Sequence, residues 1–269
     1  MTLIKNNQGP LDIIGDLHGC FEELRELLVK LGYQRIITES GNLDYGFEVI
    51  HPQGRTLVFL GDLVDRGPKI CAVLKFVMAM VGKGKALSVL GNHDDKLLRK
   101  LKGSNVQNKH GLEESLRQLA EERPEFSIAV CRFFDSLDSS YFLDHQKLVV
   151  AHAGMKEELQ KLNLKETRQF GLFGETTGKT DELGLPVRLN WAARYSGRAL
   201  VVYGHTPVAE AEWFNRTIDI DTGCVFGGKL TALRYPERDL VDVPAHAIYC
   251  QPARQFLAET AQKPGLLKI

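Results

Sequence analysis

The sequence lacks the features that would place it in a membrane or in an oxidising compartment. No apolar run approaches the ~20 residues that a helix needs to cross a bilayer. Residues 1–10 have neither the apolar core nor the cleavage site of a signal peptide. The five cysteines are odd in number and have no metal-type spacing. We therefore expect a cytoplasmic protein with reduced thiols and no membrane partner.

An excess of charge of one sign is also missing. Lys plus Arg total 34, and Asp plus Glu total 34. No overall basic character attracts the chain to nucleic acid, although a neutral total leaves room for a local basic groove. The 269 residues are 43% hydrophobic and 25% charged, which is typical of a globular protein with one large domain.

Short apolar runs rich in Val, Ile and Leu predict the strands. These runs are Leu11–Ile14, Thr56–Leu60, Ala86–Leu90, Lys147–Val150, Ala199–Tyr203, Thr217–Ile220 and Lys229–Arg234. Runs without alternation are typical of strands that are buried on both faces. Helical patterns lie between them, over residues 20–31, 68–80, 112–122 and 125–137. Strands that alternate with helices predict an α/β layered fold with helices on both faces.

Three segments carry weaker patterns. Residues 36–52 are interpreted as a polar hairpin or excursion. Residues 160–188 are interpreted as a long irregular segment, of the kind that forms a lid or a binding loop or is disordered. The tail after residue 243 is less patterned, with one short helix expected over 253–262. We expect one domain over 1–243, and a C-terminal extension over 244–269 that packs on the same domain or trails it.

Five of the apolar runs end in a small polar cluster. The clusters are Gly15-Asp16-Leu17-His18-Gly19, Gly61-Asp62-Leu63-Val64-Asp65-Arg66-Gly67, Gly91-Asn92-His93-Asp94, Ala151-His152-Ala153-Gly154 and Gly204-His205-Thr206-Pro207. In an open α/β sheet, ligands bind beyond the carboxyl ends of the strands. We therefore expect the five clusters to meet at one site.

The residue types in these clusters favour transition-metal chemistry on a phosphate. Carboxylates, an amide oxygen and imidazoles suit Mn, Fe, Zn, Ni or Co better than Mg or Ca. Asp62 is the natural bridge, because one carboxylate can hold two ions about 3.5–4 Å apart. Two such ions can share a hydroxide, lower its pKa and clamp phosphate oxygens for in-line attack.

The remaining polar residues of the same loops have other uses. Arg66 can bind a phosphate bidentately. His93 directly follows Asn92, so we expect its ring near the metals, where it can protonate a leaving alcohol. Asp65 is placed to orient and charge that histidine, and the alternative is a salt bridge that only holds the loops together.

These motifs resemble those of the calcineurin-like metallophosphoesterases, over roughly Leu11 to Arg238. The Asp-Arg-Gly and Asn-His-Asp forms point to the branch with Ser/Thr protein phosphatases and symmetrical diadenosine tetraphosphatases. The resemblance implies a four-layer fold, with a central mixed β-sandwich flanked by helices, and two metal ions, with manganese the first candidate. It also implies the ligands, which for metal one are Asp16, His18 and Asp62 and for metal two are Asp62, Asn92, His152 and His205.

Segments 173–178, 184–188, 190–193 and 220–228 are similar to the phosphatase module of bacterial polynucleotide kinase-phosphatase. In that branch Arg188 would be a second substrate-binding arginine, and Asp221 a pocket residue near the metals. An ordinary turn after a strand is the alternative for Asp221. Trp191 is interpreted as a packing residue rather than a platform for a base.

The sequence thus predicts a metal-dependent phosphoric ester hydrolase that acts by direct attack of a metal-bridging hydroxide. Nucleotides or nucleic-acid ends, including 2′,3′-cyclic phosphates and 3′-phosphates, are the first substrate hypothesis. The alternatives are a symmetrical bis(5′-nucleosyl)-tetraphosphatase, a Ser/Thr protein phosphatase, or a binding protein that has kept the fold and lost the chemistry. The complete ligand set argues against the last of these.

Overall fold

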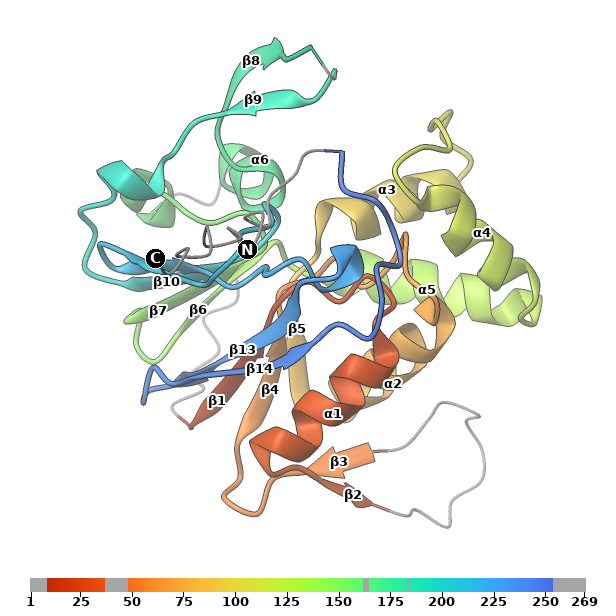
Figure 1. The fold of residues 1–269 in the computed structure, drawn as a ribbon, viewed down its shortest axis with the longest axis horizontal. Coiled ribbons are helices and arrows are strands. Elements are labelled where there is room, and N and C mark those ends of the chain that lie inside the picture. The colour runs from red at the N-terminus through yellow and green to blue at the C-terminus, as the bar shows by residue number, and fades with distance from the viewer. Residues whose placement is uncertain (1–8, 37–47, 162–164, 183, 254–269) are drawn as a thin grey trace, which may run out of the picture.

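Two five-stranded sheets face each other, and helices cover their outer sides (Figure 1). The structure is a computed structural model that describes residues 9–36, 48–161, 165–182 and 184–253. The first sheet has the order β14-β13-β1-β4-β5, formed by Leu240–Pro244, Lys229–Tyr235, Leu11–Ile14, Thr56–Phe59 and Ala86–Ser88. The second has the order β11-β12-β10-β7-β6, formed by Trp213–Phe214, Thr217–Asp219, Leu200–Tyr203, Leu148–Ala151 and Ser140–Leu143.

Both sheets are mixed, with parallel strands at the positions that matter for the site. β1 runs parallel to β4, and β4 to β5, while β13 and β14 are antiparallel. In the second sheet β10 runs parallel to β7 and to β12. Each of the seven predicted strands is present within one or two residues of its expected ends. The predicted α/β fold, a mixed β-sandwich flanked by helices, is confirmed.

The core explains why the strand sequences do not alternate. Leu11 and Ile13 of β1 pack in the apolar cluster between the two sheets, whereas Ile14 packs in the cluster under the helices. In the second sheet Val150 faces the first sheet, and Val149 packs in a third cluster on the outer side. Because both faces of each sheet are covered, apolar residues stabilise the fold at successive positions.

The helices form the outer layers. They are α1 (Phe21–Leu31), α2 (Ile70–Gly82), α3 (Asn92–Leu101), α4 (Leu112–Ala120), α5 (Pro124–Ser136) and α6 (Lys165–Phe173), with 3₁₀ turns at Glu157–Lys161, Ala192–Arg194 and Cys224–Phe226. The apolar side of α1, formed by Leu24, Leu27, Leu28 and Leu31, is buried, and Gly32 ends this helix at a φ of 94°. The helix predicted from residue 68 begins at Ile70, because Pro68 and Lys69 form a turn.

The prediction of an irregular segment over 160–188 is wrong for most of its length. It contains α6 and a hairpin of β8 (Thr176–Thr180) and β9 (Pro186–Arg188), which stands apart from the body of the molecule (Figure 1). All of β8 is exposed, so it carries no apolar period by which a strand is recognised. The strands β6, β11 and β14 were not predicted either.

The remaining weak segments are partly described. β2 (Gln34–Ile36) pairs antiparallel with β3 (Glu48–Ile50), as expected for the two ends of a hairpin, and residues 37–47 lie outside the described residues. The helix predicted over 253–262 lies outside them too, except for its first residue. Up to residue 250 the C-terminal segment is held by backbone hydrogen bonds to Gly228 and Val225. The division at residue 243 stays a prediction.

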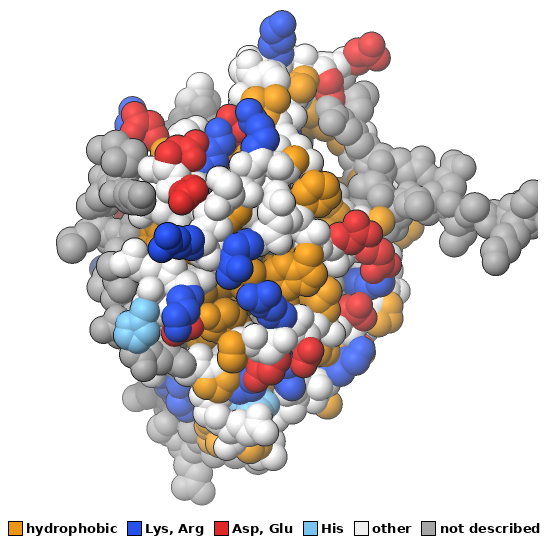
Figure 2. Space-filling model, turned by 90° about the vertical axis from the view of Figure 1, so that its left-hand side faces the viewer, with side chains coloured by type: hydrophobic (Ala, Val, Ile, Leu, Met, Phe, Trp, Pro, Cys, Tyr) orange, Lys and Arg blue, Asp and Glu red, His pale blue; other side chains and the backbone are white. Residues whose placement is uncertain are grey.

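Two surface properties follow from the described residues. No described helix is both long and apolar enough to cross a membrane. Several Lys and Arg side chains surround a hydrophobic area in the middle of the face seen in Figure 2. The neutral net charge therefore coexists with a local gathering of cations.

Candidate active site

The site lies where the carboxyl ends of parallel strands from both sheets meet. The first sheet supplies Asp16 and His18 after β1, Asp62 after β4 and Asn92 after β5, and the second supplies His152 after β7 and His205 after β10. Direct contacts join the loops. The His18 N–H donates to the Asp62 carbonyl at 2.7 Å, and the His205 N–H donates to Asp16 Oδ2 at 3.1 Å. The six predicted ligands are thus brought to one place.

The backbone of these loops is tightly turned. Five non-glycine residues in them have a positive φ, namely His18 (39°), Asp62 (45°), Asp65 (71°), Arg66 (69°) and His205 (76°). Non-glycine residues in this left-handed region cost free energy and gather at functional sites.

Glycines make the close approach of the loops possible. A Cβ on Gly61 would lie 2.4 Å from the Gly91 nitrogen, and one on Gly91 would lie 2.2 Å from the Asp62 nitrogen. A side chain at either position would collide with the neighbouring loop.

Asp62 lies at the centre of the site. It belongs to two groups, His18–Asp62–His93 and Asp62–His152–His205, in which the ligand atoms lie within 4.8 Å of one another. Its Oδ2 is 3.5 Å from His18 Nε2, and its Oδ1 is 3.5 Å from His152 Nε2. The two carboxylate oxygens therefore point to different histidines, which suits a bridging ligand.

Backbone carbonyls orient two of the imidazoles. His18 Nδ1 donates to the Val64 carbonyl at 2.6 Å, and His152 Nδ1 donates to the Leu60 carbonyl at 2.9 Å. The proton is thereby held on Nδ1, so each Nε2 presents a lone pair to the site. Burial lowers the pKa of His152 to about 3 and also holds the pKa values of His18 and His205 well below the ordinary range. Neutral imidazole is the form that binds a metal ion.

Several buried nitrogen and oxygen atoms that can bind a metal ion converge at this end of the site. His152 Nε2 lies 2.9 Å from Asn92 Oδ1 and 3.0 Å from His205 Nδ1. Asp16 Oδ1 and His205 Nε2 are buried and have no hydrogen-bond partner among the described residues. Orphaned acceptors of this kind are rare in folded proteins, and a cation would satisfy them. The residues therefore fit divalent metal ions.

Arg66 lies over two of the histidines. Its Nη1 is 2.6 Å from His18 Nε2, its Nη2 is 2.8 Å from His93 Nε2, and the guanidinium lies 5.1 Å from the centroid of the Phe226 ring. The guanidinium donates both bonds, so in this state it covers the nitrogen that His18 would offer to a metal. A bound phosphate would compete for the same N–H groups.

His93 is held in place from its other nitrogen. Its Nδ1 donates to Asp65 Oδ2 at 2.6 Å, and the Ser115 hydroxyl donates to Asp65 Oδ1 at 2.5 Å. Burial raises the pKa of Asp65 to about 6, and burial together with Arg66 holds the pKa of His93 well below its usual value. The predicted pairing of Asp65 and His93 is present.

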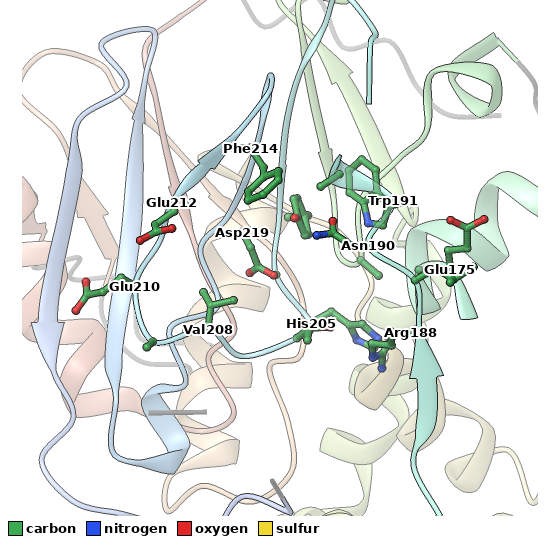
Figure 3. Close-up of a pocket in the computed structure, with 18 residues that line it drawn as sticks. Glu175, Arg188, Asn190, Trp191, His205, Val208, Glu210, Glu212, Phe214 and Asp219 are labelled. Atoms are coloured by element: carbon green, nitrogen blue, oxygen red, sulfur yellow. The ribbon is translucent and has the colours of Figure 1, made fainter. Parts of the chain in front are cut away.

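Two more predicted residues come from later elements. Arg188, on β9, lies beside His205 (Figure 3), and its Nη1 donates to the Phe173 carbonyl at 2.8 Å. Asp221 is buried after β12, and its Oδ1 accepts the Gly223 N–H at 3.1 Å. Burial raises the pKa of Asp221 to about 7, and the charge of Asp62 adds to the rise. Asp221 thus closes a local turn and also feels the charge of Asp62.

Sequence reasoning missed three residues that support the site. Asp94 stands in a predicted cluster, and it accepts the Leu63 N–H at 2.9 Å and the Gly91 N–H at 3.0 Å, which ties two ligand loops together. Asp219 is buried at the end of β12 with a raised pKa, caused by burial and then by Asp221. Ser115 lies on α4, and no local pattern marks it. Of these three residues, only Asp94 could have been found from the sequence, because it stands in one of the five polar clusters.

A third group of ligand-type atoms lies behind the site. Cys20, Glu23 and Cys224 are buried within 4.8 Å of one another. The hydrogen bond with Cys20, and then burial, raise the pKa of Cys224, so the Cys224 thiol stays protonated. Glu23 Oε1 accepts the His246 N–H at 2.9 Å and the Tyr249 hydroxyl at 2.8 Å. This group packs the C-terminal segment against α1.

The model of the calcineurin-like phosphoesterase family matches residues 9–243 of the chain. The chain belongs to this family. The family resemblance inferred from the sequence is therefore confirmed, and with it a hydrolase of phosphate esters that uses divalent metal ions.

Curated relatives of this phosphoesterase carry a more specific name. One from Anoxybacillus flavithermus is 46% identical over 88% of this chain and 95% of its own length. One from Bacillus subtilis is 44% identical over 88% of this chain and 96% of its own length. Both are named bis(5′-nucleosyl)-tetraphosphatase PrpE, asymmetrical.

Solved structures agree on the fold of this phosphoesterase. A candidate diadenosine tetraphosphatase superposes with a TM-score of 0.60 at 28% identity, over 89% of this chain and 95% of that chain. A protein serine/threonine phosphatase from Saccharomyces cerevisiae superposes with a TM-score of 0.59 over 90% of this chain and 82% of that chain. At 15% identity, the second likeness shows the fold alone.

Proposed function

We propose that this phosphoesterase hydrolyses dinucleoside tetraphosphates asymmetrically, to a nucleoside monophosphate and a nucleoside triphosphate. The observation that carries the proposal is 46% identity over 88% of the chain to a relative with that name. Symmetrical cleavage, which the sequence motifs alone suggested, is the alternative. A cytoplasmic location, in which the free cysteines stay reduced, belongs to the same proposal.

The proposed metal sites share one carboxylate. Metal one would be held by Asp16, His18 and Asp62, and metal two by Asp62, Asn92, His152 and His205. Such ions, once bound, neutralise charge on the phosphoryl oxygens and activate water at neutral pH. The mixture of nitrogen and oxygen donors favours manganese, with iron, cobalt, nickel or zinc as alternatives.

Arg66 is the residue that we expect to move when substrate binds. In the free protein it donates to His18 Nε2 and to His93 Nε2. If these N–H groups turned to phosphate oxygens, His18 Nε2 would be free to bind the metal. His93 Nε2 would be free to take up a proton. Arg188, which lies beside His205, would add a second guanidinium to the phosphate site.

His93 would then act on the leaving group. Asp65 and Ser115 hold its ring, so that Nε2 faces the place that Arg66 vacates. From there it can protonate the departing oxygen. A polyphosphate is a better leaving group than an alcohol, so an anhydride should depend less on this proton than an alkyl ester does.

A substrate panel tests the proposal. Diadenosine tetraphosphate, a 2′,3′-cyclic nucleotide, p-nitrophenyl phosphate and a phosphopeptide would each be assayed with manganese. We expect the highest kcat/KM for the tetraphosphate, with AMP and ATP as the products. ADP as the sole product would overturn the asymmetrical assignment, and preference for the phosphopeptide would overturn the nucleotide class.

Hydrolysis of nucleic-acid ends is the second candidate. Its support is the similarity of segments 173–178 and 190–193 to the phosphatase module of polynucleotide kinase-phosphatase, because these segments adjoin the cavity beside His205. An oligonucleotide with a 3′-phosphate or a 2′,3′-cyclic end, added to the same panel, separates the two candidates. Turnover of that end above the tetraphosphate would favour the second.

A further inference from the structure

A cavity of about 580 Å³ opens directly beside the proposed metal ligands. His205 and Arg188 lie at one end of it, and Phe214 lies at the other (Figure 3). The volume is in the range of sites that hold small molecules, about 300–1,000 Å³. Of the proposed catalytic and metal-binding residues, Arg188 and His205 line this cavity, and both lie at its inner end.

The two ends of the cavity differ in chemistry. At the inner end Arg188 is a cation, and the neighbouring metal ligands would add positive charge when loaded. At the outer end Asn190 lies near the rings of Phe214 and Trp191 (Figure 3). Asn190 Oδ1 accepts the Ala193 N–H at 3.1 Å, and its amide nitrogen has no hydrogen bond within the described part of the chain. A fitting ligand therefore carries an anion at one end and a flat polar ring at the other.

Phe214 presents a ring to this cavity. It lies on the two-residue edge strand β11 and is 49% exposed, which is unusual for so large an apolar side chain. Its neighbour Trp213 does not line the cavity, because successive side chains of a strand point to opposite faces. Trp213 contacts Arg238 instead, whose guanidinium carbon lies 5.8 Å from the ring centroid.

The rim of the cavity limits where phosphates can lie. Glu175, Glu210 and Glu212 line it, so a chain of several phosphates would meet carboxylates there. Lys156 and Arg194 pair with Glu175, and Lys229 pairs with Glu210, so Glu212 is the rim carboxylate without an ion pair among the described residues. Carboxylates do suit ribose hydroxyls and base amino groups, which donate hydrogen bonds. The inner end, with Arg188, is therefore the more favourable place for a phosphate.

We propose that this cavity binds the nucleoside that carries the reacting phosphorus, with the base stacked on Phe214 and its edge hydrogen-bonded to Asn190. The inference rests on the proposed function and deepens it, because it names the part of the substrate that the cavity holds. One phosphate then separates this nucleoside from the metal centre, and cleavage at that phosphorus leaves a nucleoside monophosphate in the cavity. The longer phosphate chain extends away from the carboxylate rim.

AMP is the probe that tests this subsite. In the manganese-loaded protein, AMP and inorganic phosphate would each be titrated as inhibitors of p-nitrophenyl phosphate hydrolysis. Phosphate occupies the inner end alone, whereas AMP occupies both ends. We expect Phe214→Ala to raise the ratio of the AMP to the phosphate inhibition constant roughly tenfold, the size of effect that loss of base stacking produces.

The neighbouring ring provides a matched control. Trp213→Ala removes an exposed aromatic side chain from the same strand but from the opposite face, so the ratio should stay at its wild-type value. Phe214→Trp keeps a flat ring in the cavity and should restore the ratio. Thermal melting of each variant shows whether the fold is retained.

The outcomes separate failure of the subsite from failure of the proposed function. An unchanged ratio in Phe214→Ala, or an equal change in Trp213→Ala, overturns the subsite. Wild-type protein that does not cleave diadenosine tetraphosphate, yet shows the Phe214-dependent AMP ratio, retains the subsite and loses the tetraphosphatase function. Cleavage of the tetraphosphate with an unchanged ratio in Phe214→Ala retains the function and loses the subsite.

Discussion

The site has two walls that differ in burial and in the origin of their residues. The inner wall consists of the proposed metal ligands, and its central side chains are almost fully covered, with Asp62 2% and His152 0% exposed. The outer wall comes from the β8–β9 hairpin, the segment after it and the edge strand β11, where Phe214 is 49% exposed. The inner wall is held by buried strands, and the outer wall is carried on exposed elements.

This difference separates the reaction from the choice of substrate. Inner-wall side chains are fixed by hydrogen bonds to backbone groups, such as those of Val64, Leu60 and His93. Such fixed geometry is what metal binding and phosphoryl transfer require. The outer wall lies on exposed elements, so it can differ between phosphoesterases without disturbing the metal centre. Substitutions in the two walls should therefore change different kinetic quantities.

The largest effect is expected from Asp62→Ala. Removal of the shared carboxylate should abolish binding of both ions and lower the turnover of p-nitrophenyl phosphate by roughly a thousandfold or more. The metal content per chain and kcat are the measurements. Asp95→Asn changes a partly buried carboxylate outside the site that pairs with Arg99, and it should keep both. If the Asp62→Ala protein still bound two ions and hydrolysed p-nitrophenyl phosphate, the inner wall would not be the metal centre.

His93→Asn comes next. It should keep the metals but lower kcat by about 10²–10⁴-fold on an alkyl phosphate, because the leaving oxygen loses its proton donor. The loss should be smaller on diadenosine tetraphosphate, whose leaving group needs less protonation. Ser115→Ala should produce a weaker loss of the same kind. Equal losses on both substrates would contradict the general-acid role.

Arg188→Ala tests the junction of the two walls. The guanidinium should stabilise the bound phosphate, so we expect KM for the tetraphosphate to rise roughly tenfold, the effect of one charged hydrogen bond. Metal content should be unchanged. Arg194→Ala removes a nearby arginine that pairs with Glu175, and it should leave KM as it is. A loss of bound metal in Arg188→Ala would place this residue with the inner wall instead.

The smallest effect is a pH-dependent change in stability. The pKa of Asp221 is raised from 3.8 to about 7 by burial, so the folded protein holds a proton that the unfolded chain releases. Its contribution to stability is complete below pH 3.8 and is lost as the pH rises through about 7. An amide side chain at this position cannot ionise. In metal-free protein, the Tm of Asp221→Asn relative to that of the wild type should therefore rise by a few degrees between pH 3.8 and about 7.

Thermal melting in the presence of a chelator measures this difference. Parallel Tm curves of the two proteins would mean that Asp221 titrates as an exposed turn residue does. Added manganese should reduce the difference, because bound cations stabilise the ionised carboxylates of the inner wall.

The inner wall could be predicted from the sequence because each ligand directly follows a buried strand. Parallel strands end at the same edge of a sheet, so Asp16, Asp62 and Asn92 are neighbours whenever β1, β4 and β5 are. The helix α1 and the central strands carry apolar patterns strong enough to be recognised. The β8–β9 hairpin, by contrast, has no apolar face, and β11 is only two residues long.

By itself, the sequence determined the fold class and the reaction class, because these follow from strand periodicity and from the motifs that resemble a known family. Only the tertiary structure decided how the ligands face one another, that Ser115 supports Asp65 from a distant helix, and that Phe214 forms one end of the cavity beside His205. These contacts join segments far apart in the chain. No local pattern encodes them, because they depend on how the two sheets pack.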